Sequence, residues 1–523
     1  MKISAGGRSS GYAAAMNRPR IVIVGAGING LVAANYLQRA GCDVSMVERA
    51  ERVGGACVSA TANVDGVRQD YALGASVLGL MQDFVFSETG LAERLETYVP
   101  DDAKLVYFPG DSTPTRIYRN STELDAELAE RWGESGEVEA FRADEEKVVD
   151  FLIRGYRDAR PPSIDDANAE LGPELTSLWI SGSARQLMDH YLTSERSKIY
   201  MAMTVTESGP VSLDDPYSAF TLPLMDSGTI FGSYYGFVKG GIWRITEELG
   251  RINEELGVKT HLSSPVEAID AQSGRVSWSH DGQKFDEHFD HIVFATDPLS
   301  AARLNGDSEI EESIAGLRFR GSSGKLNLMF QKPVRWKHAG DTDTPFRFRF
   351  SVDSLEDFEA ATTAVMDEGN HYVPGYAQIY CEGAAMRQLG FDEPFDRLAV
   401  FFKNLALDQP GEELPEVRDE IRATILELIE NPEDCSWQRL LTPADLRETF
   451  LFPGGNLDHT MLTGGQTYFD RSFSSDPASD FYRFGEHENV HICGSGTYPC
   501  GSVTGTPGYM CAAQLLGREN LSA

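Results

Sequence analysis

The pattern of hydrophobic and polar positions is most regular near the start of the chain. Residues 20–24 form a short apolar, β-branched run, which is typical of a strand buried on both faces of a parallel sheet. A glycine turn follows, residues 28–40 predict a helix that ends at Gly41, and residues 43–48 predict a second strand. Together these segments predict a βαβ unit.

The rest of the chain divides into segments with different patterns. From about residue 81 to 235, apolar positions at helical spacing and loops rich in Pro, Asp and Ser predict an inserted, partly helical region. Residues 242–256 predict a helix, and four short strand-like runs between residues 258 and 295 predict a return to the first sheet. A mixed region continues to about residue 450, with one clear helix that starts near Pro415.

Length and charge limit the classes of protein to consider. A chain of 523 residues with 41% hydrophobic residues predicts two or three compact units with a real core. The formal net charge of -34 repels phosphate backbones and anionic bilayers. We therefore expect no nucleic-acid partner and no purely electrostatic attachment to a membrane. A chain of this length can bury a large cofactor, and we expect a small-molecule substrate.

Cysteine usage and the N-terminal residues indicate the compartment. Seven cysteines occur without a CxxC pair or a His/Cys cluster, which predicts a reducing, cytoplasmic location and no metal site. Residues 1–17 lack the apolar core of a signal peptide and predict a flexible leader, in which Met16 is an alternative start. Glycines and asparagine interrupt the longest apolar stretch, residues 21–37, so we expect no membrane span.

The sequence GAGING at residues 25–30 carries the first chemical signal. It lies directly after the predicted buried strand and opens the predicted helix, as a dinucleotide-binding fingerprint must. Gly25 permits the tight turn, Gly27 lets the backbone approach a pyrophosphate, and Gly30 allows the helix to pack closely on the strand. The free N–H groups of the first helical turn face the anion.

Two further features follow the second strand. Glu48 ends this strand, where its carboxylate accepts hydrogen bonds from adenosine ribose hydroxyls and disfavours a 2′-phosphate. The pair Gly54-Gly55 allows a second close approach of the backbone to the dinucleotide. NAD and FAD share this fingerprint, so the choice between them depends on the rest of the chain.

A strand, a glycine loop and a helix recur at residues 489–516. A helix in this place directs its positive N-terminal end toward the pyrimidine carbonyl of a flavin, where negative charge accumulates on reduction. Each glycine segment taken alone is also compatible with an ordinary turn. The three segments together favour FAD.

The chain resembles the phytoene-desaturase-like flavoproteins, which include carotenoid desaturases, retinol saturases and the animal pyridine nucleotide-disulphide oxidoreductase domain-containing proteins. The resemblance runs nearly end to end. It rests on the motifs at residues 23–30, Glu48, 54–56, 71–78, 236–241, 452–456 with His459, and 499–505.

This resemblance implies an α/β fold of the glutathione-reductase-like flavoprotein class. Its Rossmann-type FAD-binding domain would be discontinuous, formed by residues 18–80, 235–300 and 450–523. Residues 81–234 and 301–449 would form an inserted, mixed α+β substrate domain with a helical lid.

The resemblance also places Val266 beside the adenine ring and Asp297 near the cofactor. Motifs and resemblance together predict a set of FAD-binding residues. These are Gly25, Gly27, Ile28, Asn29, Gly30, Glu48, Arg49, Gly54, Gly55, Ala56, Val266, Asp297, Gly494, Ser495, Gly501, Ser502, Val503 and Gly505.

The chain departs from the family pattern in two places. Many relatives have an arginine after the glycine pair and a run of glycines after the C-terminal proline. Here these places hold Ala56-Cys57 and Cys500-Gly501-Ser502. We expect the larger side chains to narrow the space beside the flavin, so a carotenoid substrate is not carried over.

The predicted reaction removes two hydrogens from adjacent carbons, or from a C–N bond, of an apolar, polyene or isoprenoid-like substrate, with FAD accepting the hydride. His459 is the candidate proton acceptor, because a histidine pKa suits that task. Such a histidine also often serves only to satisfy buried backbone groups.

Four alternatives remain open from the sequence. The first is an amine or amino-acid oxidase, and the second is a saturase that runs the reaction in reverse. The third is a non-catalytic protein that escorts prenylated partners. A serine hydrolase has the least support, because no G-x-S-x-G elbow is present. Peripheral membrane contact and the oligomeric state also remain open. The aromatic residues that would suit the cage of an amine oxidase are Tyr468, Phe469, Phe473, Phe481 and Tyr482.

Overall fold

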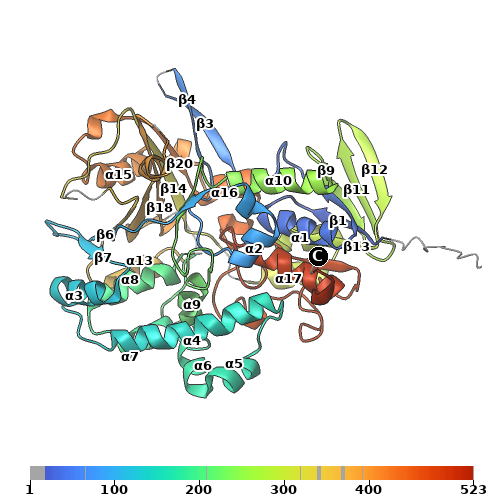
Figure 1. Cartoon of the computed structure of the whole chain (residues 1–523), viewed down its shortest axis with the longest axis horizontal. Helices are drawn as coiled ribbons and strands as arrows, with labels where there is room; N and C mark the ends of the chain where they lie inside the picture. The colour runs from blue at the N-terminus through green and yellow to red at the C-terminus, as the bar shows by residue number, and fades with distance from the viewer. Residues whose placement is uncertain are drawn as a thin grey trace, which may run out of the picture.

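A computed structural model shows two sheet-based bodies joined along a shared face, with a row of helices beneath them (Figure 1). The predicted leader, residues 1–17, lies outside the described residues. The structure describes residues 18–521 except 65, 208, 318–319, 339–342, 367–370 and 392.

The first body is built on a five-stranded parallel sheet in the order β21-β13-β1-β2-β9. Its strands come from three distant segments of the chain. The first segment supplies β1 and β2, the second supplies β9 and β13, and the third supplies β21. They span Arg20–Val24 (β1), Asp43–Val47 (β2), Lys259–His261 (β9), His291–Phe294 (β13) and Val490–Ile492 (β21).

The central strand β1 is buried on both faces, as its sequence predicts. Ile21 and Ile23 belong to the same apolar core as the helix α1 (Ile28–Arg39). This helix lies between α10 (Arg244–Leu256) and α17 (Thr506–Leu516).

Val22 and Val24 face the opposite side of the sheet, where they pack with Trp278 and Phe289. The aromatic side chains come from an antiparallel three-stranded sheet and the residue that follows it. Its strands are β10 (Val266–Asp270), β11 (Arg275–His280) and β12 (Gln283–His288), and the helices α11 (Pro298–Asn305) and α12 (Ser308–Ala315) lie nearby. The prediction missed β12 and was wrong to return β10 and β11 to the first sheet, because these strands pair antiparallel with each other and with β12.

The second body is built on a seven-stranded sheet in the order β20-β14-β18-β17-β15-β6-β7. All neighbours are antiparallel except β15 and β6, which run parallel. The sequence predicted a mixed region here but not this sheet. Its strands are β6 (Lys104–Tyr107), β7 (Thr115–Ile117), β14 (Gly324–Phe330), β15 (Phe346–Phe350), β17 (Tyr376–Cys381), β18 (Asp396–Phe402) and β20 (Cys435–Leu441).

Helices fill the region that was predicted to be helical, and several of them contact this sheet. The helix that was predicted to start near Pro415 is α15 (Pro415–Leu426), which packs Ile421 and Ile425 against the sheet. The others are α2 (Asp83–Glu88), α3 (Ser121–Trp132), α4 (Val138–Arg157), α5 (Ile164–Leu171), α6 (Pro173–Trp179), α7 (Ala184–Tyr191), α8 (Glu195–Val205), α9 (Thr221–Met225), α13 (Leu355–Thr363), α14 (Glu382–Gln388) and α16 (Pro443–Phe450).

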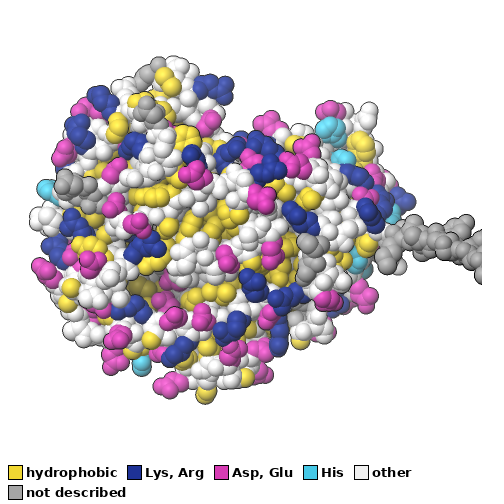
Figure 2. Space-filling model, in the orientation of Figure 1, with side chains coloured by type: hydrophobic (Ala, Val, Ile, Leu, Met, Phe, Trp, Pro, Cys, Tyr) yellow, Lys and Arg dark blue, Asp and Glu magenta, His cyan; other side chains and the backbone are white. Residues whose placement is uncertain are grey.

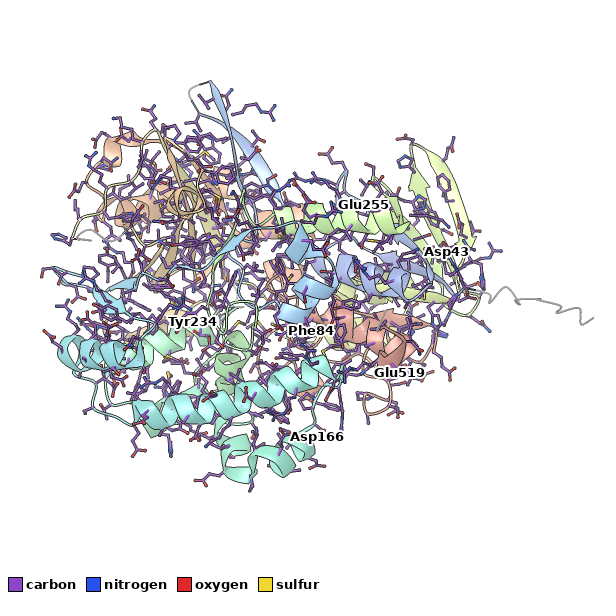
Figure 3. The ribbon with its side chains drawn as sticks, in the orientation of Figure 1. Asp43, Phe84, Asp166, Tyr234, Glu255 and Glu519 are labelled. Atoms are coloured by element: carbon purple, nitrogen blue, oxygen red, sulfur yellow. The ribbon has the colours of Figure 1, made fainter. Side chains whose placement is uncertain are left out.

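Short two-stranded pairs and aromatic contacts complete the fold. Phe84 of α2, labelled in Figure 3, packs edge-on against Tyr509 of α17 with the ring centroids 4.9 Å apart. The pairs are β3 (Ser59–Val64) with β4 (Val67–Ala72), β5 (Thr97–Tyr98) with β8 (Phe237–Val238), and β16 (His371–Tyr372) with β19 (Leu405–Ala406).

Acidic and basic side chains are interspersed over the face seen in Figure 2, so the net negative charge forms no single patch on that face. Within the described part of the chain, no helix combines the length and the apolar character needed to cross a bilayer.

Candidate functional site

One cavity of about 720 Å³ extends from the glycine loop of the first body to the seven-stranded sheet of the second. Most of the predicted FAD-binding residues line it. They are Gly25, Gly27, Ile28, Asn29, Glu48, Arg49, Gly54, Gly55, Ala56, Val266, Asp297, Ser495, Ser502 and Val503.

The glycine loop is held in place by backbone hydrogen bonds. Gly25 N–H donates to the Val47 carbonyl at 2.9 Å, and Gly54 N–H donates to the Ala26 carbonyl at 2.8 Å. A Cβ built on Gly27 would have the Gly55 Cα, at 3.9 Å, as its nearest neighbour, so this position opens onto the cavity. The N-terminus of α1, with its unpaired N–H groups, begins at the next residue.

Glu48 connects this loop to the end of β2. One carboxylate oxygen accepts a hydrogen bond from Ala26 N–H at 2.7 Å, and the other accepts one from Ala50 N–H at 2.8 Å. These bonds fix the carboxylate at the cavity wall, where Val266 also lies. Each oxygen keeps acceptor capacity for a further donor, such as a ribose hydroxyl.

Four of the predicted residues lie behind the wall and act through packing. A Cβ on Gly30 would lie 2.4 Å from the Gly25 carbonyl oxygen, and one on Gly494 would lie 1.8 Å from the Thr296 carbonyl oxygen. Gly501 N–H donates to Asp458 Oδ1 at 2.8 Å. Gly505, with a φ of +68°, precedes α17. Close backbone approach explains Gly30 and Gly494, and contact with neighbouring side chains explains Gly501 and Gly505, without direct contact with the cavity.

The C-terminal wall of the cavity contains unusual backbone geometry. His459, Ser502 and Val503 line the cavity with φ values of +66°, +65° and +60°. Such values are strained for residues with a Cβ, above all for a β-branched valine. Strain of this kind collects at ligand-binding segments, where the surrounding structure maintains it.

Arg471 holds the two C-terminal segments together. The side chain is 1% exposed, and burial lowers its pKa. It was not predicted, because nothing in its local sequence distinguishes it from a surface arginine. Its guanidinium donates to the main-chain carbonyls of Asp458, Met461, Gln466, Ser495 and Thr497.

His459 lines the cavity beside Asp458. Its Nδ1 is buried without a hydrogen-bond partner among the described residues, and its ring packs 5.1 Å from that of Phe452. Burial lowers the His459 pKa, and the carboxylates of Asp297 and Asp458 oppose the shift. The imidazole is therefore neutral near pH 7 and able to accept a proton.

The wall contributed by the seven-stranded sheet, called here the sheet-side wall, carries charged and polar side chains. Glu207, Ser323, Gln378, Tyr380 and Lys403 line it. Lys403 Nζ donates to the main-chain carbonyl of Glu207 and to Ser323 Oγ, the latter at 2.9 Å. Tyr380 OH donates to Gln378 Oε1 at 2.7 Å.

Lys325 of β14 occupies the border between the two bodies. Its Nζ donates to the carbonyls of Ala72 and Gly74 at 2.6 Å and 2.7 Å and to Ser76 Oγ at 2.8 Å. Burial lowers the pKa of Lys325 to about 7, and the Glu382 carboxylate opposes the shift. With three acceptors around its three protons, this ammonium is fully engaged.

Sequence reasoning missed the residues of the sheet-side wall. A usable signal was present, because Lys325 and Lys403 lie in or directly after strongly apolar runs that read GKLNLMF and LAVFFK. A buried lysine is rare unless it is paired or functional.

The five aromatic residues considered for an oxidase cage do not line the cavity, whereas Tyr235, Tyr380 and Phe401 do. Cys57 also lines it, and Cys500 is buried but does not. Of the two segments that depart from the family pattern, Ala56, Cys57 and Ser502 therefore border the cavity, and Cys500 and Gly501 do not.

The residues present fit a bound dinucleotide with a flavin. Gly27 and Gly55 leave an open cradle beside the N-terminus of α1, and Glu48 stands at the end of β2 as a ribose acceptor. The strained C-terminal segment and the sheet-side wall line the same cavity. This arrangement defines a flavin-dependent oxidoreductase.

Comparisons with known proteins agree with this class. The family described as flavin containing amine oxidoreductase matches residues 28–505, and the chain belongs to this family. The match confirms the predicted enzyme class, an oxidoreductase that depends on FAD.

Individual relatives include two of the three groups that the sequence resemblance named. The chain is 22% identical over 575 residues to pyridine nucleotide-disulfide oxidoreductase domain-containing protein 2 of Rattus norvegicus, covering 95% of this chain and 93% of the relative. It is 29% identical over 273 residues to a zeta-carotene-forming phytoene desaturase of Myxococcus xanthus, covering 49% of each.

Solved structures confirm the predicted α/β flavoprotein fold. Cyclohexylamine oxidase from Brevibacterium oxydans superposes with a TM-score of 0.56 at 16% identity, covering 96% of this chain and 99% of that structure. At this level of identity, the likeness establishes the fold.

Proposed function

We propose that the protein dehydrogenates a small molecule with an apolar body, taking a hydride and a proton from adjacent atoms. The observation that carries this proposal is the single cavity that joins the glycine loop to walls formed by Met225, Tyr235 and Phe401. When bound, FAD supplies the ring that accepts the hydride.

The cofactor-binding roles follow from the walls of the cavity. We assign the pyrophosphate to the Gly27 backbone and the N-terminus of α1, and the ribose to Glu48. Ser495, Ser502 and Val503 then face the flavin, and Arg471 keeps their two segments in register. Residues 18–80, 235–300 and 450–523 form the cofactor domain in this proposal.

His459 is the proposed proton acceptor. It lines the cavity, and because its pKa is lowered by burial, the neutral imidazole is available at pH 7. Asp297 and Asp458 then stabilise the protonated ring by charge attraction. The same geometry serves the reverse, saturating direction, in which the imidazolium returns the proton.

Amine oxidation is the second candidate, because Tyr235 and Tyr380 place two phenol rings on the cavity wall. Such rings can flank an amine substrate. A purely escorting role has less support, since the glycine loop and Glu48 retain the features needed for a dinucleotide.

An anaerobic substrate screen tests the proposed function. FAD-loaded protein is mixed with isoprenoid alkenes and alkanes in one series and with primary amines in another, and bleaching of the flavin absorbance is followed. Bleaching with alkanes or alkenes supports dehydrogenation. Bleaching with amines alone, together with release of peroxide in air, transfers support to the oxidase. Protein that takes up no FAD would refute both.

A further inference from the structure

The sheet-side wall carries opposite charges that are not fully matched within the protein. Glu207 follows α8 and Lys403 follows β18, so they reach the cavity from different elements. An ordinary hydrocarbon site has no need for either charge, since apolar walls bind hydrocarbons without the cost of burying ions.

The Glu207 carboxylate has spare acceptor capacity. Its one hydrogen-bond partner among the described residues is the Gln378 amide, at a weak 3.5 Å. Tyr380 orients that amide by donating to its oxygen at 2.7 Å. Burial raises the Glu207 pKa, and Lys403 opposes the shift. A donor from a bound molecule would satisfy the free carboxylate oxygen.

Lys403 has spare donor capacity. Its ammonium carries three protons, and its two acceptors in the described part of the chain are the Glu207 main-chain carbonyl and Ser323 Oγ. The side chain is 2% exposed, and burial lowers its pKa. Because bulk water does not reach the ammonium freely, an acceptor from a bound molecule would satisfy its third proton.

We propose that the sheet-side wall binds a neutral polar group of the substrate that both donates and accepts a hydrogen bond, such as a hydroxyl or a primary amide. The group donates to Glu207 and accepts from Lys403. The substrate is then amphipathic, with an apolar body toward Met225, Tyr235 and Phe401. This inference rests on the proposed function and specifies its substrate class.

A neutral group suits the wall better than an ionised one. A carboxylate that accepts from Lys403 would lie against the Glu207 carboxylate, and an ammonium that donates to Glu207 would lie against Lys403. Like charges in contact away from water oppose binding strongly. A hydroxyl or amide meets both partners without such repulsion.

A panel of six-carbon probes tests this proposal on the FAD-loaded protein. Hexane, 1-hexanol, hexanamide, hexanoate and hexylammonium are titrated, and binding is measured by calorimetry and by the shift of the flavin spectrum. We expect 1-hexanol and hexanamide to bind at least about tenfold more tightly than the other three, the equivalent of one good hydrogen bond. Equal affinity for hexane, or tightest binding of either ion, would overturn the proposal.

Variants locate the effect on the wall. Glu207→Leu and Lys403→Met should each reduce 1-hexanol affinity to that of hexane while FAD content stays unchanged. Lys332→Met is the matched control, because this lysine follows β14, has a side chain that is 67% exposed and pairs with Asp434 away from the cavity. Retained preference in both wall variants would contradict the proposal. Wild-type protein that does not retain FAD would instead count against the proposed function itself. Where a variant fails to fold, the binding of the five probes to the wild type decides the inference.

Discussion

Two walls of the cavity differ in the groups that they present to a ligand: the wall formed by the glycine loop, called here the backbone wall, and the sheet-side wall. The first presents backbone, with Gly27 and Gly55 open to the cavity and one fixed acid, Glu48. The second presents charged side chains, among them the half-buried Glu207 and the buried Lys403, on elements far apart in the sequence. A backbone wall suits a ligand that is shared by many proteins, and a side-chain wall can be changed for each substrate.

The largest expected effect concerns packing behind the glycine-loop wall. In Gly30→Val, the new Cβ would lie 2.4 Å from the Gly25 carbonyl oxygen and 2.8 Å from the Ala295 Cβ. We expect a loss of about 3 kcal/mol or more in the free energy of unfolding, because α1 must move off the sheet. Urea denaturation measures this loss, with Gly464→Ala as the control, because Gly464 is exposed and an added Cβ there has its nearest neighbour at 3.5 Å. An unchanged midpoint would remove the packing role of Gly30.

The same substitution at Gly27, which faces the cavity, should affect cofactor binding without affecting the fold. In Gly27→Val, the Cβ enters open space, with its nearest neighbour at 3.9 Å. The fold, and the melting temperature measured after FAD is removed from both proteins, should remain near those of the wild type. FAD content should fall by at least about tenfold, because the side chain occupies the path of the pyrophosphate. The flavin-to-protein absorbance ratio reports this. If Gly27→Val purified with full FAD, the backbone wall would not be the cofactor site.

The difference between the walls also explains what the sequence could predict. The βαβ unit, the glycine loop and Glu48 are contiguous in residues 20–48, so local spacing reveals both their fold and their chemistry. The order of strands in the seven-stranded sheet depends on pairings between distant segments, such as β6 with β15. Periodicity within one segment carries no record of such pairings.

Sites formed by side chains from distant segments of the chain could not be predicted either. Arg471 gathers five carbonyls only after the chain has folded, and Glu207 meets Lys403 only because α8 and β18 end at the same wall. The C-terminal signals were found because glycine loops stand out locally. Four of the predicted glycines proved to lie behind the cavity, since spacing alone does not distinguish a packing glycine from one that faces a ligand.

An intermediate effect is expected from the titration of Lys325, at the border between the two bodies, on the free energy of unfolding. The pKa of buried Lys325 is lowered to about 7 in the folded protein, against about 10.4 in the unfolded chain. Between these values the unfolded state binds more protons, so stability should rise with pH, by at most roughly 1.4 kcal/mol per unit. The rise is absent below about pH 7, where both states are protonated.

Lys325→Met should abolish this contribution. Urea midpoints at pH 7 and pH 9 are compared for the wild type, for the variant and for Lys332→Met, which keeps the buried lysine. We expect the wild type and Lys332→Met to gain about 2 kcal/mol relative to Lys325→Met over this range. Parallel profiles for all three would mean that the three acceptors of Lys325 hold its pKa near the ordinary value.

The smallest effect should come from the one long basic side chain predicted at the backbone wall. Arg49 is exposed, and its guanidinium donates to the Thr449 carbonyl at 2.9 Å in a bond that water can replace. Arg49→Ala should therefore change FAD affinity by less than about threefold. A titration of the apoprotein with FAD, followed by flavin fluorescence, measures this change. In the same titration, Glu48→Ala should weaken FAD binding more, because it removes the acceptor that is fixed by the Ala26 and Ala50 amides. A larger loss from Arg49 than from Glu48 would show that charge, and not backbone shape, governs cofactor binding at this wall.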